Sequence, residues 1–339
     1  MLDAMFDRAT GFIDGLQTLL FVDLLQPIFY ALGLMGYAED AYDALYWVIV
    51  GLLQVLIAYL LLRPLEALRP AEPWTDRRAL RADVIYTWIA RLGLLNIAFF
   101  FLLQPLFFHW QSLMAMHGLP QFDLDGWLPG ISDRPVVSFA IYFVVLDFAG
   151  YWYHRWQHRF GIWWELHAVH HSQRQLSLWS DDRNHFLDEM LQAAFFAALA
   201  LVIGVAPGQF LMLVAVGNFL QSVQHANARI PFGPVLGRLL VSPAFHRRHH
   251  AIGDGHEGVH RGCNFGVLLP WWDMLFGSAS WDARVKPTGI ADQLPAPAGS
   301  GRDYGGGIWA QQWRAFGRIG ARLAGRASSA QGAAKGNEA

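Results

Sequence analysis

The stretch His154-Arg155-Trp156-Gln157-His158 introduces the most informative pattern in this chain, two histidines spaced as HxxxH. Two later groups, both spaced as HxxHH, contribute His167, His170, His171, His246, His249 and His250. Residues three and four apart lie on one face of a helix, so each group should offer two or three imidazoles to one point in space. This spacing is typical of metal ligands.

The number of histidines bears on how many metal ions they could hold. A four-coordinate zinc site takes four donors, and these eight histidines exceed that number twofold. Imidazole also suits iron, and two adjacent irons could use all of them. We therefore predict a binuclear metal centre. The alternative is a chance cluster of surface or core histidines, which a single HxxxH motif would leave open but three groups together disfavour.

The composition indicates a membrane protein. The chain has 339 residues, of which 54% are hydrophobic and 15% charged, whereas soluble domains carry about 25% charged residues. A helix needs about 20 apolar residues to cross a bilayer. Four stretches approach this length, and we predict that each spans the membrane: Leu16–Met35, Ala44–Leu62, Val84–Phe108 and Val136–Tyr153.

A fifth apolar stretch, Met190–Val223, is interrupted by the turn signal Ala206-Pro207-Gly208-Gln209. We predict a helical hairpin whose two ends emerge on the same side of the membrane. Because neither half reaches full spanning length, two buried helices of a cap domain are the alternative.

The charges of the loops predict the orientation of the spans. The loop between the second and third predicted spans carries Arg63, Arg69, Arg77, Arg78 and Arg81, whereas the loops before the second and fourth spans carry only Arg134. By the positive-inside rule the arginine-rich loop is cytoplasmic. The fourth span then ends on the cytoplasmic side just before the first histidine group, and the hairpin returns the chain to that side. We therefore expect the candidate ligands on the cytoplasmic face.

The predicted organisation has five parts. Residues 1–134 form N-terminal transmembrane helices and loops, residues 135–281 form the histidine-bearing core, and residues 282–307 form a linker rich in proline, glycine and alanine. A basic amphipathic helix follows over residues 308–326, and residues 327–339 are expected to be disordered.

The amphipathic segment carries an arginine at every fourth position from Arg314, while Trp309, Trp313, Phe316 and Leu323 fall on the opposite helical face. Such a helix suits the surface of an anionic leaflet, which is the cytoplasmic one. The alternative is a helix that packs on its own protein, because several glycines weaken the segment.

Composition also excludes some chemistry. Cys263 is the only cysteine, which rules out an intrachain disulfide and a four-cysteine iron–sulfur cluster. The net charge of −2 argues against a nucleic-acid partner. The N-terminus lacks the pattern of a cleavable signal, so the first span is expected to remain. Lysine occurs only at Lys286 and Lys335, and this preference for arginine suggests a GC-rich bacterium and its cytoplasmic membrane.

The histidine groups lie in wider sequence that resembles a known superfamily. Asp147–His158 resembles the first histidine box of the sterol desaturases and fatty acid hydroxylases, and Trp164–Ser172 resembles the second. Pro243–His250 resembles the third box, followed by the trailing motifs Asn264–Gly266 and Trp272–Gly277. The resemblance covers roughly residues 147 to 277.

This resemblance implies an all-α, polytopic membrane protein whose cytoplasmic, histidine-rich helical cap holds two iron ions. The segment Gln224–Asn227 is similar to the intervening histidine motif of the superfamily, which makes His225 a ninth ligand. The implied ligand set is His154, His158, His167, His170, His171, His225, His246, His249 and His250.

Three other histidines have open roles. Arg183–His185 is similar to an Arg-x-His-Pro motif of the superfamily, but Phe186 replaces the proline and leaves the role of His185 open. His256 and His260 repeat the HxxxH spacing in a longer segment than expected, for which a mobile loop is the favoured interpretation.

The resemblance also implies an activity. It implies an oxidoreductase that activates dioxygen and hydroxylates an unactivated C–H bond of a lipid, while desaturation or stepwise methyl oxidation on the same metal pair remains an alternative. We expect a bacterial polar lipid or carotenoid as substrate. Zinc could replace iron in overexpressed protein because it binds such ligands more tightly than Fe(II).

Electrons should come from a separate ferredoxin or cytochrome with its reductase. We expect such a carrier to dock on arginines near the metal centre, unless these meet the phosphates of membrane lipids. The candidate arginines are Arg155, Arg159, Arg247 and Arg248.

Carboxylates should orient ligand rings through the second ring nitrogen, as metal-bound histidines usually require. The candidates are Asp188, Glu189, Glu165 and Asp273, each of which could instead be a surface charge.

Two polar residues in apolar segments also stand out. Asp147 precedes His154, and Asn218 precedes His225, by seven residues, which places each on the face of its histidine about 10 Å deeper in the membrane. Asp147 could hold a ligand ring or the polar part of a substrate, or it could pair with Arg91.

A non-enzymatic membrane protein is the competing class. A metal transporter needs polar ligands near the middle of the bilayer, whereas these histidines gather at one end of the predicted spans. A bis-histidine haem uses two axial ligands and would leave most of the histidines without a role. Metal analysis with an optical spectrum separates these classes from an oxygenase.

Overall fold

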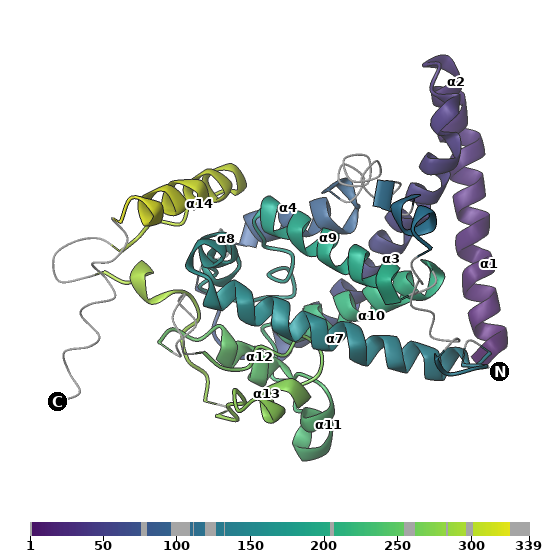
Figure 1. Ribbon diagram of the computed structural model, residues 1–339. Helices are drawn as coiled ribbons and strands as arrows, with labels where there is room; N and C mark the ends of the chain where they lie inside the picture. The colour runs from purple at the N-terminus through teal and green to yellow at the C-terminus, as the bar shows by residue number, and fades with distance from the viewer. Residues whose placement is uncertain are drawn as a thin grey trace.

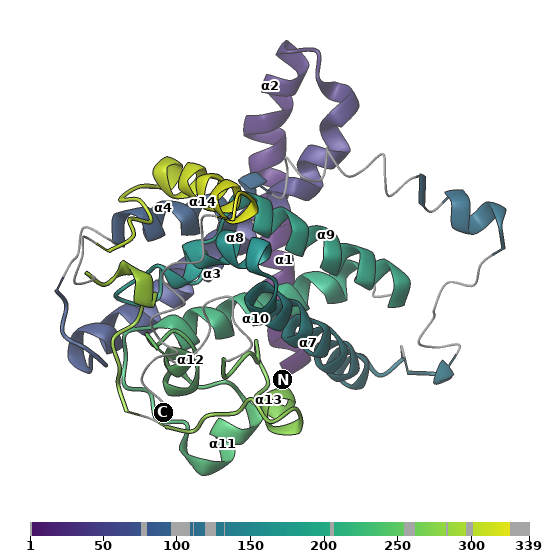
Figure 2. The same cartoon turned by 60° about the vertical axis from the view of Figure 1, so that its left-hand side comes forward.

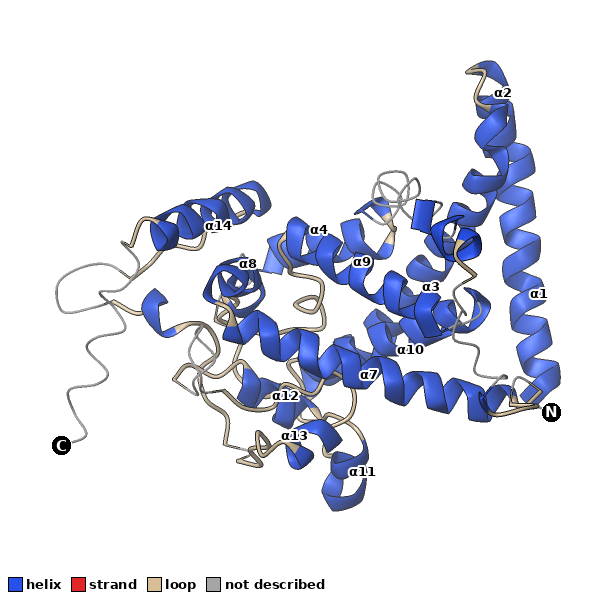
Figure 3. Cartoon of the chain, in the orientation of Figure 1, coloured by secondary structure: helices blue, strands red, loops and turns tan. Residues whose placement is uncertain are grey.

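The computed structural model describes residues 2–75, 80–95, 109–110, 112–118, 127–131, 133–203, 207–253, 262–282, 284–295 and 301–325. These residues form an all-helical protein, as predicted, in which Ala251 and Thr288 make an isolated β-bridge (Figure 3). The N-terminal elements are α1 (Leu2–Leu20), the π-helix η1 (Phe21–Leu25), α2 (Gln26–Ala31), the 3-10 helix η2 (Met35–Tyr37), α3 (Ala38–Leu68) and α4 (Leu80–Arg91). The remaining elements are α7 (Pro135–Arg159), α8 (Gly161–His171), α9 (Phe186–Ile203), α10 (Pro207–His225), α11 (Gly233–Leu239), α12 (Pro243–His249), α13 (Trp271–Leu275), η3 (Ala291–Gln293) and α14 (Ile308–Leu323).

Four helical segments among the described residues are long and apolar enough to cross a membrane: Gly11–Ala31, Met35–Leu68, Pro135–Arg159 and Phe186–Ile203. The first three overlap the predicted spans that begin at Leu16, Ala44 and Val136. The fourth is α9, the first half of the predicted hairpin, which thus reaches spanning length. The protein is an integral membrane protein with several spans.

The predicted third span, Val84–Phe108, differs from the structure. Helix α4 ends at Arg91, and a turn follows in which Gly93 has a positive φ of 66°. A left-handed glycine is a common way to end a helix. The continuous apolar stretch therefore does not form one helix from Val84, and its residues 96–108 lie outside the described residues.

Helices α3 and α4 approach each other closely at one glycine. A Cβ atom on Gly51 of α3 would lie within 1.7 Å of the carbonyl oxygen of Arg91. Only glycine can occupy this position while the two helices stay in contact. Further along α3, the buried Glu66 accepts hydrogen bonds from the backbone N–H groups of Leu178 and Asn227, at 2.8 and 3.0 Å. The end of α3 thus supports two loops next to the histidine-bearing helices.

The histidine-bearing helices lie together at one end of the molecule. Helix α8 contacts α7, α9 and α14, and α10 contacts α3, α7 and α12. Figures 1 and 2 show α8 and α14 side by side, and Figure 1 shows α1 on the other side of the molecule. The ends of the long apolar helices therefore lie next to the short helices α8 and α12.

The amphipathic segment forms helix α14, and two of its arginines pair within the protein. Arg318 and Arg322 of α14 turn toward the protein and pair with the buried Glu165 of α8, at 3.1 and 2.9 Å. Trp309 and Trp313 are each 71% exposed. The arginines turn inward because Glu165 offers them a buried partner. The last predicted helical residue, Arg326, and the tail 327–339 lie outside the described residues.

The close approach of α3 to α4 generates a stability prediction. We expect Gly51→Ala to destabilise the protein by about 1–3 kcal/mol, because the new methyl group overlaps the Arg91 carbonyl and forces the helices apart. Gly15→Ala is the control, since its added methyl group meets no atom within 4 Å. Alanine is favoured over glycine in helices by about 0.5–1 kcal/mol, so Gly15→Ala should be neutral or stabilising. Thermal unfolding in detergent measures both, and equal midpoints would contradict the prediction.

Candidate metal centre

The nine predicted ligands are all buried and come from four helices. His154 and His158 lie one turn apart on α7, and the three histidines of the second box end α8. His225 is the last residue of α10. The third box occupies α12, with His250 as its C-cap. Each of the nine side chains is at most 8% exposed.

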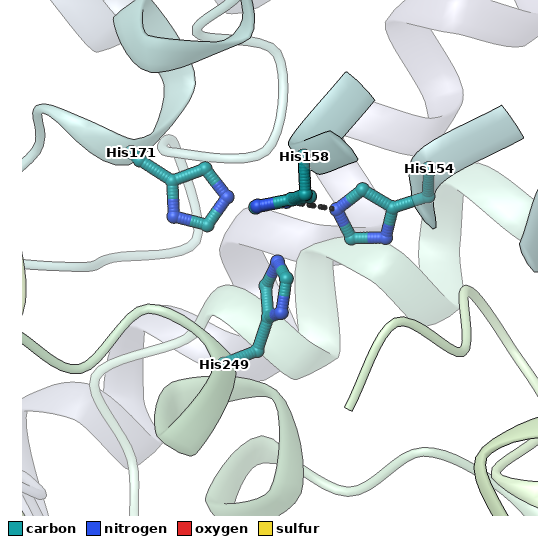
Figure 4. A group of neighbouring side chains, drawn as sticks. All are labelled: His154, His158, His171 and His249. Carbon is teal, nitrogen blue, oxygen red and sulfur yellow. Dashed lines mark hydrogen bonds between the residues drawn. The ribbon is translucent and has the colours of Figure 1, made fainter. Parts of the chain in front are cut away.

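Eight of these histidines form two groups of four. Within each group one ring nitrogen per histidine lies within 4.8 Å of the others. The first group is His154, His158, His171 and His249, and Figure 4 shows the four rings converging on a common space. The second group is His170, His225, His246 and His250.

The adjacent histidines of each HxxHH motif go to different groups. Residues next to each other on a helix point about 100° apart, so His170 and His171 cannot face the same point. The same holds for His249 and His250. The prediction that each sequence group serves one point was therefore wrong in detail, because α8 and α12 each supply both groups. The rings of His171 and His250 stack at 4.3 Å, which places the two groups side by side.

Hydrogen bonds to backbone carbonyls orient three of the rings. The Nδ1 atoms lie 2.9 Å from the Phe265 oxygen for His154, 2.8 Å from the Cys263 oxygen for His249, and 2.9 Å from the Gln221 oxygen for His225. A carbonyl can only accept, so each Nδ1 carries the proton and each Nε2 keeps a lone pair. These lone pairs are available to a metal ion.

The spacing of the Nε2 atoms fits a metal ion. The pair His154–His158 is 3.2 Å apart, and His225 lies 3.3 Å from His170 and 2.9 Å from His246. Nitrogens bound about 2.1 Å from one ion are about 3.0 Å apart at right angles and about 3.4 Å apart at tetrahedral angles. Because Nδ1 of His225 carries the proton, its Nε2 has no hydrogen to donate, and its single lone pair can accept a hydrogen bond from only one of the two neighbours. A cation between the rings therefore explains the cluster better than hydrogen bonding does.

Burial keeps the second group neutral. Desolvation lowers the pKa of His170, His246 and His250 well below the usual histidine value, and the neighbouring imidazoles lower it further. A neutral imidazole is the form that binds a metal. The residues present therefore suit a metal ion in each group.

His167 lies beside the two groups but belongs to neither. Its Nδ1 atom is 3.4 Å from Oδ2 of Asp188. Asp188 is buried and also accepts hydrogen bonds from Gln157 at 2.8 Å and Trp163 at 2.7 Å. Of the four predicted carboxylates, Asp188 is thus the one placed against an imidazole of the predicted ligand set.

The trailing motif acts on His154 through the backbone. Asp273 accepts hydrogen bonds from the N–H groups of Phe265 and Gly266, at 2.8 and 2.6 Å, and so holds the carbonyl that orients His154. Gly266 has no room for a side chain, since a Cβ would lie 2.6 Å from the Leu269 oxygen. Asn264 adopts the left-handed region with φ of 60°, which asparagine tolerates better than most residues.

Asp147 supports the same loop. Its carboxylate accepts hydrogen bonds from the N–H groups of Leu268 and Leu269 at 2.8 and 3.1 Å, and from the Trp272 indole at 2.8 Å. Neither interpretation of Asp147 from the sequence matches these contacts. Arg91, the partner considered there, forms ion pairs of 2.7 and 2.9 Å with Asp181 and Asp182 instead.

Among the described residues, none of the remaining polar candidates belongs to a group of four. Nδ1 of His185 accepts from the Leu187 N–H at 3.1 Å, so its Nε2 donates to the Gln312 carbonyl at 3.1 Å and the ring joins the start of α9 to α14. Asn218 is half-buried, and its backbone carbonyl accepts a hydrogen bond from the Ser222 hydroxyl. Glu165 pairs with α14, and the Glu189 N–H donates to the His185 carbonyl within the first turn of α9. His256 and His260 lie outside the described residues.

Two of the arginines predicted to dock an electron carrier are turned inward. Arg247 is 5% exposed and pairs with Glu72 at 2.7 Å. Arg248 pairs with Asp282 at 3.2 Å. Because both charges are paired within the protein, these two arginines are less suited to bind a carrier than exposed ones. Arg159 is exposed and Arg155 is half-buried.

Sequence reasoning missed several groups that position the rings. Asp181 lies 3.5 Å from Nδ1 of His225, and burial raises the pKa of its carboxyl to about 6 although Arg91 opposes the rise. Arg183 donates to the Val169 carbonyl at 2.9 Å and to the buried Asp83 at 2.8 Å, which fixes the end of α8. The only sequence signal for Asp181 is its position two residues before the motif Arg183–His185. The backbone carbonyls that orient the rings have no sequence signal.

Fold and site together define an all-helical, integral membrane protein with two adjacent, buried groups of four histidines. Comparison with known proteins shows which family its core resembles. Residues 139–278 match the family "fatty acid hydroxylase". The histidine-bearing core of the chain thus carries a fatty acid hydroxylase domain and is similar to sterol desaturases and lipid monooxygenases.

Several characterised relatives are similar to this core. An alkylglycerol monooxygenase from Homo sapiens is 31% identical over 139 residues, and one from Danio rerio is 30% identical over 136 residues; each match covers 40% of this chain and 29% of the relative. A delta(7)-sterol 5(6)-desaturase from Gibberella zeae is 25% identical over 142 residues, which cover 42% of this chain and 41% of that protein. The chain thus spans less than a third of the alkylglycerol monooxygenases that it matches. No solved structure matches the chain significantly.

The two groups generate a prediction of metal content. Wild-type protein should hold about two metal ions per chain, because four imidazoles fill one site. We expect His158→Ala and His225→Ala each to lower the content to about one, since each removes a donor from a different group. His167→Ala should keep both ions because His167 lies outside both groups, and exposed His117→Ala is the control.

Metal content per chain is measured by mass spectrometry of the purified protein. A wild-type content of one ion that neither ligand variant changes would contradict the prediction.

Proposed function

We propose that this protein is a membrane-bound oxygenase that uses two histidine-held iron ions and dioxygen to hydroxylate an unactivated C–H bond of a lipid. One observation carries the proposal. Two buried imidazole groups stand next to each other at the ends of apolar helices, within the segment that matches the fatty acid hydroxylase family.

The donor set supports iron as the working metal. Iron supplies redox chemistry for the reduction of dioxygen when it is bound, whereas zinc has none. Imidazole suits both metals, and zinc has the higher affinity, so zinc in overexpressed protein agrees with iron in the cell.

The residues of the chain hold the centre in place and keep it dry. Carbonyls of Phe265, Cys263 and Gln221 fix the tautomers of three rings. The burial of all eight grouped rings excludes bulk water from the space between them, which limits side reactions of a reactive centre. Asp188 and Asp181 stand behind His167 and His225 and hold their orientation.

The position of the groups supports a lipid substrate. His154 and His158 end a candidate span, so a lipid chain can approach from the bilayer without crossing water. The relatives include monooxygenases named for alkylglycerols and for methylsterols, which favours insertion of oxygen into a lipid. Desaturation is the second candidate, because the same core is similar to sterol 5(6)-desaturases.

Comparative lipid mass spectrometry separates these reactions. Cells that express the protein should gain a lipid with one more oxygen atom than its precursor. Cells that express His158→Ala/His225→Ala should lack this species, because both groups lose a donor. A product that has lost two hydrogens would replace hydroxylation with desaturation, and lipid profiles identical to those of the double variant would contradict the proposal.

Orientation and electron supply complete the proposal. We propose that the histidine groups face the cytoplasm. Arg63 and Arg69 support this, because they lie at the C-terminal end of α3, which contacts the loops beside the histidine-bearing helices. Electrons would come from a separate ferredoxin or cytochrome with its reductase. Arg159 at the exposed end of α7 is the cation best placed to meet an acidic carrier, since Arg247 and Arg248 are paired within the protein.

The docking role of Arg159 has a matched control on the same helix. Arg134 and Arg159 stand at opposite ends of α7, and both are exposed. Arg159→Glu should lower the rate supported by an acidic ferredoxin severalfold at low salt, and Arg134→Glu should not. The difference should shrink as ionic strength rises, because salt screens such steering.

Turnover kinetics of reconstituted protein measure this effect. Equal rates for the two variants would remove Arg159 from the docking surface, and turnover with dioxygen and NADPH alone would show that no separate carrier is needed.

A further inference from the structure

Helix α14 lies outside the segment that matches the fatty acid hydroxylase family, yet it is tied closely to the metal centre. Arg318 and Arg322 pair with Glu165 of α8, the helix that supplies histidines to both groups. Gln312 is buried, accepts from the Phe186 N–H at 2.8 Å, and donates to Tyr86 of α4 at 2.9 Å. One face of α14 is thus fixed to α8, to α4 and to the start of α9.

The opposite face of α14 is apolar and exposed. Trp309 and Trp313 are each 71% exposed, Leu323 is 69% exposed and Phe316 is 43% exposed. At about 100° per residue, these four positions fall within about 80° of one another on the helix. A continuous apolar stripe of this kind is unusual on a surface in contact with water.

The stripe begins where a membrane span begins. The ring of Trp309 meets that of Phe186 edge to face at 6.2 Å, and Phe316 packs against His185 at 4.9 Å. Phe186 is the first residue of the candidate span Phe186–Ile203. The apolar face of α14 therefore adjoins α9 at the residue where the candidate span begins, and Figure 1 shows α14 next to that end of α9.

We infer that α14 is an interfacial helix whose aromatic face lies in the headgroup region of the bilayer while its polar face holds α8. Tryptophan is favoured at that depth because its ring is apolar and its N–H is polar. Attraction to anionic lipid contributes little to membrane binding by α14, because Arg318 and Arg322 are paired with Glu165. The helix thus ties the position of both histidine groups to the membrane surface.

A single reporter in the full-length, membrane-reconstituted protein tests this inference. Cys263, the only cysteine, is first replaced by serine, and the metal content of that background is checked. Trp313→Cys then receives an environment-sensitive nitrobenzoxadiazole label. The same label at Arg314→Cys, one residue further round the helix and 45% exposed in its side chain, is the matched control. Val235→Cys on α11, where valine is 71% exposed, is a control away from the stripe.

The labelled proteins are placed in neutral phosphatidylcholine vesicles with and without brominated acyl chains. Brominated lipid should quench the label at position 313 at least twofold more than at position 314, and emission at 313 should shift to shorter wavelength. Equal quenching at positions 313, 314 and 235 would place the stripe in water and overturn the inference. A second copy of the chain could also cover the stripe. In that case the label at position 313 would emit at shorter wavelength without being quenched by brominated lipid, and Trp313→Cys would form a disulfide-linked dimer before labelling, which would overturn the inference. The readout needs neither metal nor activity, so it stands apart from the proposed function.

Discussion

The structure depends on the crowding of imidazole nitrogens in a buried space. The Nε2 atoms of His225 and His246 lie 2.9 Å apart, and the rings of His171 and His250 stack at 4.3 Å. Wherever two such nitrogens both lack a proton, their lone pairs repel each other unless a cation lies between them. The surrounding carboxylates, the segment 265–269 and helix α14 hold the rings in these positions.

The supporting contacts use carboxylates in two different ways. Asp188 and Asp181 lie directly behind His167 and His225. Asp273 and Asp147 act at one remove, because they bind backbone N–H groups of the segment 265–269 and thereby aim the Phe265 carbonyl at His154. Removing Asp273 or Asp147 would loosen the His154 ring, although neither carboxylate contacts that ring. This indirect role explains why buried acids surround a site whose ligands are neutral.

The C-terminal helix shows how a buried partner can fix the orientation of an amphipathic helix. The sequence predicts that its basic face suits the surface of an anionic leaflet, but Glu165 of α8 supplies a buried carboxylate for two of the arginines. A buried charge without a partner is costly, so the pairing decides which face turns inward. The aromatic face is then left exposed to the bilayer. Through its contacts with α8, the helix supports the metal centre although it lies outside the histidine-bearing core.

The sequence alone determined the helical class, three of the apolar spans before His154 and seven of the eight grouped histidines, because periodicity and composition act locally along the chain. The eighth, His225, was indicated by the resemblance to a known superfamily. The sequence could not show which group His170 and His171 each join, since this depends on how α8 and α12 pack. It also could not show the partners of Asp147, Arg91 and Arg247, because side chains distant in sequence meet only in the folded chain. The ring-orienting carbonyls have no side-chain signature at all, so tertiary packing alone decided the tautomers on which metal binding depends.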